Sequence, residues 1–165
     1  MNLSGAMLGS RLGSWRREGV DMQRKVAGIL DEKGTGVWAV SPSDTVLSAL
    51  ETMAQHNIGA VLVLDGDDLS GILTERDYAR KIKLAALGSG DTPVASIMTK
   101  PVVTVVPTAS VAECMELMTD RRIRHLPVVD DDGRLVGIVS IGDIVKAMMA
   151  QQRDLIADLE RYITG

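Results

Sequence analysis

Two short motifs in the sequence pair a hydroxyl with a carboxylate at the same spacing. They are Thr74-x-x-Asp77 and Ser140-x-x-Asp143. An ionised aspartate offers two acceptor oxygens, which suit the paired hydroxyls of a ribose, as acidic residues do in dinucleotide-binding folds. The first turn of a helix beside such a carboxylate would also present free N–H groups to a phosphate. The motifs therefore indicate two candidate nucleotide sites.

The same residue pairs have a purely structural interpretation, the capping box. In a capping box a hydroxyl at the helix N-cap and a side chain three residues later accept hydrogen bonds from each other's backbone N–H groups. Ser, Thr and Asp are common near helix starts for this reason alone. The usual partner is the longer Glu or Gln, whereas both motifs here use Asp. The motifs by themselves leave both interpretations open.

An internal duplication that covers most of the chain contains both motifs. The two copies superimpose at an offset of 65 residues, which becomes 66 after a polar turn in each copy. Insertions belong in hairpin turns, so this change of offset fits two copies of one structural unit. The aligned ranges are 37–65 with 102–130, 71–77 with 137–143 and, more loosely, 26–30 with 94–98.

The apolar pattern within each copy predicts a strand, a helix, two strands and a second helix. Apolar residues recur at helical spacing after Pro42 and Pro107, which are helix-start signals. Short continuous apolar runs then read as buried strands joined by polar turns. These runs and the strands after them are 60–64 with 71–73 and 126–129 with 135–139. We expect the second helices at Glu75 to Leu87 and from Gly142 onward.

The motifs and their order resemble the CBS domain, a repeat named after cystathionine beta-synthase. Two such repeats in tandem resemble the Bateman module, and the resemblance covers about residues 24–150. It implies an α+β fold in which two βαββα repeats pack sheet to sheet with pseudo-twofold symmetry. The segments that carry it are Arg124-His125-Leu126-Pro127-Val128-Val129-Asp130, Gly137-Ile138-Val139-Ser140 and Gly71-Ile72-Leu73-Thr74-Glu75-Arg76-Asp77. The expected divisions are a flexible tail (1–23), a first repeat (24–90), a second repeat (91–150) and a C-terminal helix extension (151–165).

The resemblance also implies roles for particular residues. Asp77 and Asp143 would bind ribose, with Thr74 and Ser140 near ribose or phosphate. Further candidates for phosphate are Arg76, Arg80, Arg122, Arg124 and His125, whereas Arg121, Lys81 and Lys83 are interpreted as solvated surface charge. Candidates for the adenine pocket are Val37, Trp38, Gly59, Ala60, Val61, Val102, Val103, Thr104, Leu126 and Pro127. A tryptophan in a strand is more often core or interface, so that alternative stays open for Trp38.

The two copies differ where basic residues precede the first long strand. Gly59 and Ala60 in the first copy align with Arg124 and His125 in the second. In one interpretation the first repeat leaves room for an adenine-containing ligand and the second grips a phosphate. In the other, the small residues only permit close packing between the repeats. Either way, two identical sites are not expected.

Composition narrows the possible functions. The chain has 165 residues, of which 45% are hydrophobic and 24% charged, and its net charge of −4 argues against general nucleic-acid binding. The single Cys114 excludes an intramolecular disulfide and fits a reducing cytoplasm, and no Cys/His cluster has the spacing of a metal site. No apolar run approaches the length of a membrane span.

These features predict a cytoplasmic, non-catalytic sensor. It would bind adenine nucleotides such as AMP, ATP or NAD(H) between its repeats, without a metal, and signal to an unknown protein target in trans. Apolar residues after Asp143 keep helical spacing almost to the C-terminus, which indicates either a homodimer interface or a helix that folds back on its own repeats. The alternative function is a structural dimerisation module with vestigial pockets. A small nicotinamide-dependent enzyme would need a substrate site that the sequence does not display.

Overall fold

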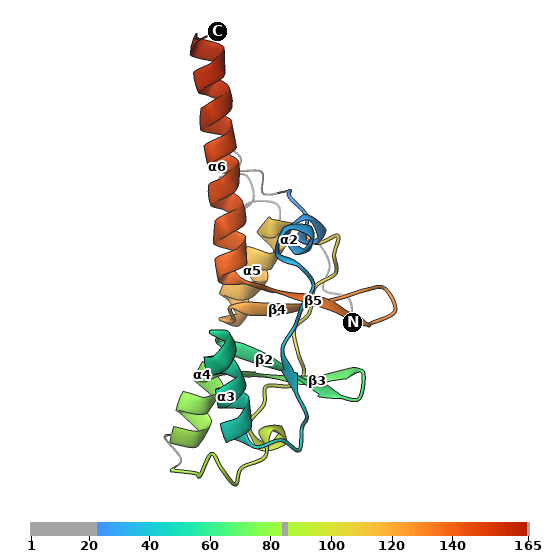
Figure 1. The fold of residues 1–165 in the computed structure, drawn as a ribbon. Helices are drawn as coiled ribbons and strands as arrows, with labels where there is room; N and C mark the ends of the chain where they lie inside the picture. Colours follow the sequence, from blue (N-terminus) through green and yellow to red (C-terminus); the bar gives the residue numbers. More distant parts are fainter. Residues whose placement is uncertain (1–22, 84–85, 165) are drawn as a thin grey trace.

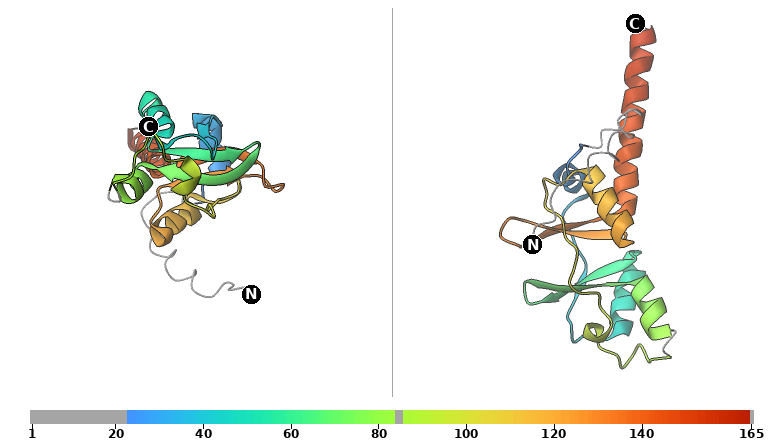
Figure 2. Two further views of the ribbon diagram at one scale, coloured as in Figure 1. Left: turned by 90° about the horizontal axis from the view of Figure 1, so that it is seen from below. Right: turned by 180° about the vertical axis from the view of Figure 1, so that it is seen from behind.

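The computed structural model describes residues 23–83 and 86–164. Two small α/β units lie one above the other, and a single long helix, α6 (Ile141–Thr164), projects away from them (Figures 1 and 2). The expected tail, residues 1–23, falls almost wholly outside the described residues. The two units and the long C-terminal helix confirm the expected fold class.

The first unit is built on a three-stranded sheet. Its strands are β1 (Ala39–Val40), β2 (Ala60–Asp65) and β3 (Asp68–Thr74), in that order across the sheet. β1 runs parallel to β2, and β2 pairs antiparallel with β3 through the predicted polar turn. Helix α3 (Val46–His56) connects β1 to β2, and the side chain of its N-cap, Thr45, accepts a hydrogen bond from the Ser48 backbone.

The second unit repeats this plan with a shorter sheet. Strands β4 (His125–Val129) and β5 (Leu135–Ser140) form an antiparallel pair, preceded by helix α5 (Val111–Arg121). The strand that corresponds to β1 is reduced to a single parallel bridge between Val105 and Val128. The predicted strand, helix, strand, strand, helix order is thus complete in the first unit and lacks a full first strand in the second.

The helix after β3 differs from the expected uninterrupted helix between Glu75 and Leu87. Only Glu75–Asp77 is α-helical (α4), and Tyr78–Lys83 is a π-helical segment (η1). Leu84 and Ala85 lie outside the described residues. The wider π turns are common at functional sites, and here they directly follow the Thr74-x-x-Asp77 motif.

The two units exchange segments, which the linear repeat did not indicate. Helix α2 (Val26–Lys33) precedes the first unit in the chain, but its Val26, Ile29 and Leu30 are buried in the hydrophobic core of the second unit. Conversely, the short 3-10 helix η2 (Val94–Ser96) and Ile97 belong to the core of the first unit. Each core is therefore completed by a segment from the other half of the chain: α2, which precedes the first sheet, packs in the second unit, and η2, which precedes the second sheet, packs in the first.

Two aligned glycines allow this exchange. A Cβ at Gly137 of β5 would lie 2.8 Å from the Leu30 side chain of α2, and a Cβ at Gly71 of β3 would lie 2.5 Å from that of Met98. Backbone can approach this closely only where there is no side chain. The glycines thus mark where each exchanged segment packs on a sheet.

Helix α6 is covered by the second unit only over its first turns. Ile144 and Ala147 are buried against that unit's core, whereas almost every residue from Gln152 onward is exposed. The exposed part carries large apolar side chains among its charged ones. They include Met149, Leu155, Ile156, Leu159 and Ile163.

Candidate functional site

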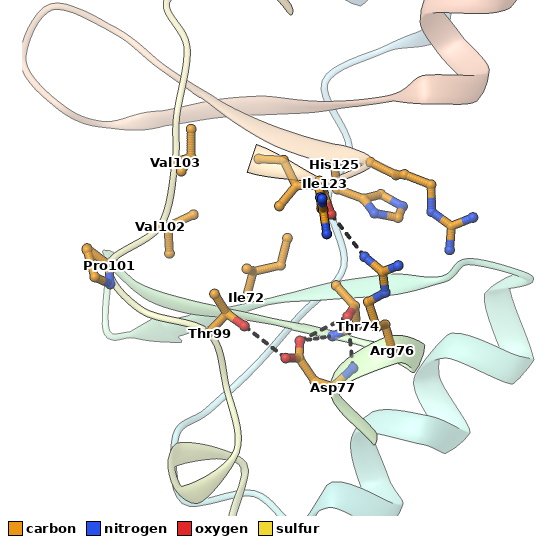
Figure 3. A pocket seen from close by; sticks show the side chains of 12 residues that line it. Ile72, Thr74, Arg76, Asp77, Thr99, Pro101, Val102, Val103, Ile123 and His125 are labelled. Atoms are coloured by element: carbon orange, nitrogen blue, oxygen red, sulfur yellow. Dashed lines mark hydrogen bonds between the residues drawn. The ribbon is translucent and has the colours of Figure 1, made fainter. Parts of the chain in front are cut away.

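A cavity of about 140 Å³ lies between the two units (Figure 3). β3, α4, the segment that links the units and the residues just before β4 all contribute to its wall. Small-molecule pockets usually measure roughly 300–1,000 Å³, so a bound ligand would have to displace side chains at the rim. The lining residues are Ile72, Thr74, Arg76, Asp77, Thr99, Pro101, Val102, Val103, Arg122, Ile123, Arg124 and His125.

Asp77 is held in this wall by donors from three directions. It is only 9% exposed. Its Oδ2 accepts hydrogen bonds from the Thr74 backbone N (3.0 Å) and Oγ1 (2.9 Å), and its Oδ1 accepts one from Thr99 Oγ1 at 2.9 Å (Figure 3). Lys81 Nζ lies 3.0 Å from Oδ1. The capping box is therefore formed, and the same carboxylate also faces the cavity.

Basic side chains form the opposite wall. Arg76, next to Asp77, donates from Nη1 to the Arg122 carbonyl at 3.0 Å, which joins the two units across the cavity (Figure 3). Arg122 caps the end of α5 in the left-handed conformation, with φ at 53°, and the chain turns there toward Arg124 and His125. Burial lowers the pKa of His125, and the Arg124 guanidinium lowers it further. The cavity thus joins the carboxylate of the first repeat to the basic residues of the second.

The second motif also forms a capping box, but with a different partner. Asp143 Oδ2 accepts from the Ser140 backbone N (2.8 Å) and Oγ (3.0 Å). The same oxygen lies 2.7 Å from Nζ of Lys33, the last residue of α2. Burial alone would raise the pKa of Asp143, but the hydrogen bond and charge of Lys33, with the donors of Ser140, hold it below its usual range.

The structure separates the expected adenine-pocket residues into several groups. Val102 and Val103 line the cavity. Val61 and Leu126 are 0% exposed and lie in the two hydrophobic cores, and neither is among the residues that line the cavity. Trp38 stacks on His56, with ring centroids 3.3 Å apart, and Thr104 faces a separate hollow beside α5.

The remaining candidates are not among the residues that line the cavity. Val37 packs with the small apolar cluster of β2 and β3, and Ala60 and Pro127 are buried in their strands. A Cβ at Gly59 would meet Glu75 at 3.5 Å and His125 at 3.9 Å, which are ordinary contact distances, so packing alone does not require a glycine there. Arg80 is exposed and is not among the residues that line the cavity.

Sequence reasoning missed three polar partners of the two carboxylates: Thr99, Lys81 and Lys33. Lys81 was interpreted as solvated charge, although its position four residues after Asp77 is the spacing of a helical ion pair. Thr99 and Lys33 are distant in sequence from the carboxylates that they contact. No local pattern could have identified them.

Comparison with known proteins agrees with this architecture. The family model of the CBS domain matches residues 20–84 and 94–150. The chain belongs to the CBS domain family. It is 44% identical over 137 residues to the CBS domain-containing protein CBSX3, mitochondrial, of Arabidopsis thaliana, covering 80% of this chain and 66% of that protein. It is 38% identical over 128 residues to YhcV of Bacillus subtilis, covering 77% of this chain and 89% of YhcV.

Solved CBS structures share the fold. A signal-transduction protein with CBS domains from Burkholderia ambifaria is 49% identical, with a TM-score of 0.75, and the match covers 78% of this chain and 96% of that one. A CBS domain protein from Pyrobaculum aerophilum, solved in complex with AMP, is 24% identical, with a TM-score of 0.65 over 73% of this chain and 89% of that one. Tandem CBS pairs are regulatory modules.

The described residues show no membrane-spanning helix and no metal-binding group. None of the described helices is both long and apolar enough to cross a membrane. The same part of the chain contains no group of three His, Cys, Asp or Glu side chains that could hold a metal ion.

Proposed function

We propose that the protein is a regulatory sensor that binds an adenine nucleotide in the cavity between its CBS repeats. The observation that carries the proposal is the pairing, within one cavity, of the buried Asp77 with the basic residues before β4. A carboxylate can accept the hydroxyls of a ribose, and guanidinium groups bind phosphate through paired N–H donors. Such a wall is suited to a ligand that carries both groups.

The apolar part of the cavity supports a base beside the ribose. Ile72, Val102 and Val103 form an aliphatic surface on the side of the cavity that Thr99 and Pro101 also line (Figure 3). AMP is the first ligand to test, because a protein of the same fold holds AMP. ATP and NAD(H) share its adenosine monophosphate part and are tested with it.

Ligand-induced stabilisation tests the proposal. Saturation at about 100 times Kd should add about 2.7 kcal/mol to the free energy of unfolding, which at roughly 2–4 °C per kcal/mol raises Tm by about 5–11 °C. We expect this shift with AMP in the wild type and in the matched control Asp68→Ala, which removes an exposed carboxylate at the first residue of β3. Asp77→Ala should lose it.

Two outcomes would contradict the proposal. One is the absence of a Tm shift with AMP, ATP and NAD(H) alike in the folded wild type. The other is an Asp77→Ala variant that melts at a lower temperature but binds AMP as tightly as the wild type. That result would leave Asp77 with the role of a helix cap only.

Signalling to another protein would follow from the contact between the repeats. The bond from Arg76 to the Arg122 carbonyl spans the cavity, so a ligand that engages either arginine alters how the two units meet. We propose that the target is a separate protein and that the function is not catalytic. The buried Cys114 thiol further favours a reducing compartment such as the cytoplasm.

A homodimer formed through α6 is the second candidate function. It is favoured by the apolar side chains on the uncovered part of α6, among them Ile156 and Leu159, both more than half exposed. A truncated chain that ends at Gln151 should be monomeric by light scattering while the full chain is dimeric. If the full chain is monomeric at micromolar concentration, α6 does not serve this purpose.

A further inference from the structure

The pseudo-twofold arrangement of the repeats would place a second cleft beside Asp143, equivalent to the cavity beside Asp77. There Lys33 takes the place that Thr99 has at Asp77. In the first repeat the Ile72 carbonyl accepts a hydrogen bond from the Thr99 backbone N at 2.8 Å, and Asp77 accepts one from Thr99 Oγ1 at 2.9 Å. Ile138 and Asp143 are the aligned acceptors of the second repeat. There, one ammonium serves both, because Lys33 Nζ lies 2.9 Å from the Ile138 carbonyl and 2.7 Å from Asp143 Oδ2.

The exchange of segments brings Lys33 to this position. Helix α2 lies so close to β5 that Leu30 fills the space where a Cβ at Gly137 would be. Lys33 is one turn further along, at the end of the helix, and the chain turns away at Gly34 with φ at 91°. From this position the ammonium reaches the end of β5 and the start of α6, where it contacts the Ile138 carbonyl and Asp143.

The chemistry of the two donors differs. At Asp77, the Thr99 hydroxyl is neutral and can rotate away, and the cation, Lys81, lies 3.0 Å from Oδ1 with a side chain that is 43% exposed. Lys33 is a cation, and charge-assisted hydrogen bonds are roughly twice as strong as neutral ones. The side chains of Lys33 and Asp143 are only 31% and 16% exposed, so solvent screens the pair less than it would a surface pair. A ribose that binds Asp143 would have to displace the Lys33 ammonium.

The positions that are basic around Asp77 do not carry cations in the other copy. Four positions that are basic around Asp77 align with uncharged residues in the other copy. They are Arg76 with Gly142, Arg122 with Asn57, Arg124 with Gly59 and His125 with Ala60. At these positions, a phosphate in the second cleft would find no partner to compensate for the loss of the Lys33 pair.

We propose that Lys33 closes the second cleft by holding Asp143 in an internal ion pair, so that each chain binds a single nucleotide, in the Asp77 cleft. The inference rests on the proposed function and adds its stoichiometry and the residue that sets it. Lys33 acts as a built-in competitor of the ribose. Its removal should expose a nucleoside site that the wild type does not offer.

Isothermal titration with AMP and with adenosine tests the inference. The wild type should bind one AMP per chain, Asp77→Asn should bind none, and Asp143→Asn should still bind one. Lys33→Met should bind a second adenosine per chain, and the double variant Asp77→Asn with Lys33→Met should recover adenosine binding. Lys146→Met is the matched control, because this exposed lysine lines the same hollow between α2 and α6 and should leave the stoichiometry at one.

The outcomes separate this inference from the proposed function. Two AMP molecules per wild-type chain would overturn the inference and leave the proposed function intact. The same conclusion follows if both Lys33→Met and the milder Lys33→Gln fold but gain no adenosine. Failure of the wild type to bind any adenine nucleotide would instead refute the proposed function on which the inference rests.

Discussion

Filling the space above Gly137 should destabilise the protein through a contact between two exchanged elements. In Gly137→Ala the new Cβ would lie 2.8 and 3.1 Å from the two Leu30 methyl carbons. Overpacking costs about 1–3 kcal/mol, and replacing a strand glycine returns about 0.5–1 kcal/mol. The free energy of unfolding should therefore fall by up to about 2.5 kcal/mol, which lowers Tm by up to about 10 °C.

The measurement is thermal and urea unfolding of a double-mutant cycle. Leu30→Ala alone should cost about 2–5 kcal/mol, because it opens a cavity in the core. In the double variant, the Cβ of the alanine at position 137 no longer meets the Leu30 methyl groups. The loss of unfolding free energy in the double variant should therefore be smaller, by about 1 kcal/mol, than the sum of the losses in the two single variants. Gly90→Ala is the control, because a Cβ there meets nothing within 4 Å.

Additivity would refute this reasoning. If the costs of Gly137→Ala and Leu30→Ala add to within about 0.3–0.5 kcal/mol, the two residues are not in contact and α2 does not pack on β5 in solution. An equal loss of stability in Gly90→Ala would also refute it, because the effect would then come from the backbone rather than from Leu30.

Three further predictions concern single sites. Burial and Arg124 hold the pKa of His125 below its usual range, so the imidazole is neutral near pH 7. AMP affinity, measured by titration calorimetry, should therefore rise as the pH falls toward that pKa. The control is His125→Gln, in which only the titration of the phosphate changes the affinity. The same shift should make the free protein less stable below about pH 6.5, where the unfolded state binds the proton more readily; a melting temperature as insensitive to pH as that of the glutamine variant would contradict this. Burial raises the pKa of Cys114 to about 11, so the thiol should resist a thiol reagent at pH 8 until the protein unfolds, and prompt labelling of the native state would show that it is accessible. Thr74→Ala and Ser140→Ala should each lower the free energy of unfolding by about 1 kcal/mol in urea titrations, because each removes a capping hydroxyl, and unchanged stability would mean that these caps contribute nothing.

Much of the fold was predictable because its signals are local and repeated. The turns between β2 and β3 and between β4 and β5 are short polar interruptions of apolar runs, and they recur in register. The long α6 followed from helical spacing that continues past the second repeat. The similarity of residues 26–30 to 94–98 was also visible, but similarity does not say in which core a segment is buried. The core in which each segment is buried depends on contacts between residues far apart in the chain.

The candidate site was predictable in its motifs and not in its assembly. Thr74 and Asp77 face the cavity as the spacing suggested, and both functions left open for them, cap and ligand contact, fit the same geometry. Asp77 lies in the same cavity as Arg122 and His125 because the two repeats pack together. The spacing of residues within one repeat does not reveal this arrangement. Lys33 is the clearest case, because its partner Asp143 is 110 residues away.

The exchange of α2 also bears on how the chain reaches its native state. Helix α2 is synthesised before its partners in β5, with Lys33 and the Ile138 carbonyl separated by 105 residues. Closing so long a loop carries an entropic cost that only the complete core offsets. During translation, we therefore expect α2 to lack its native contacts until β5 has left the ribosome. We therefore expect that neither repeat folds alone and that the pair folds and unfolds in a single cooperative step.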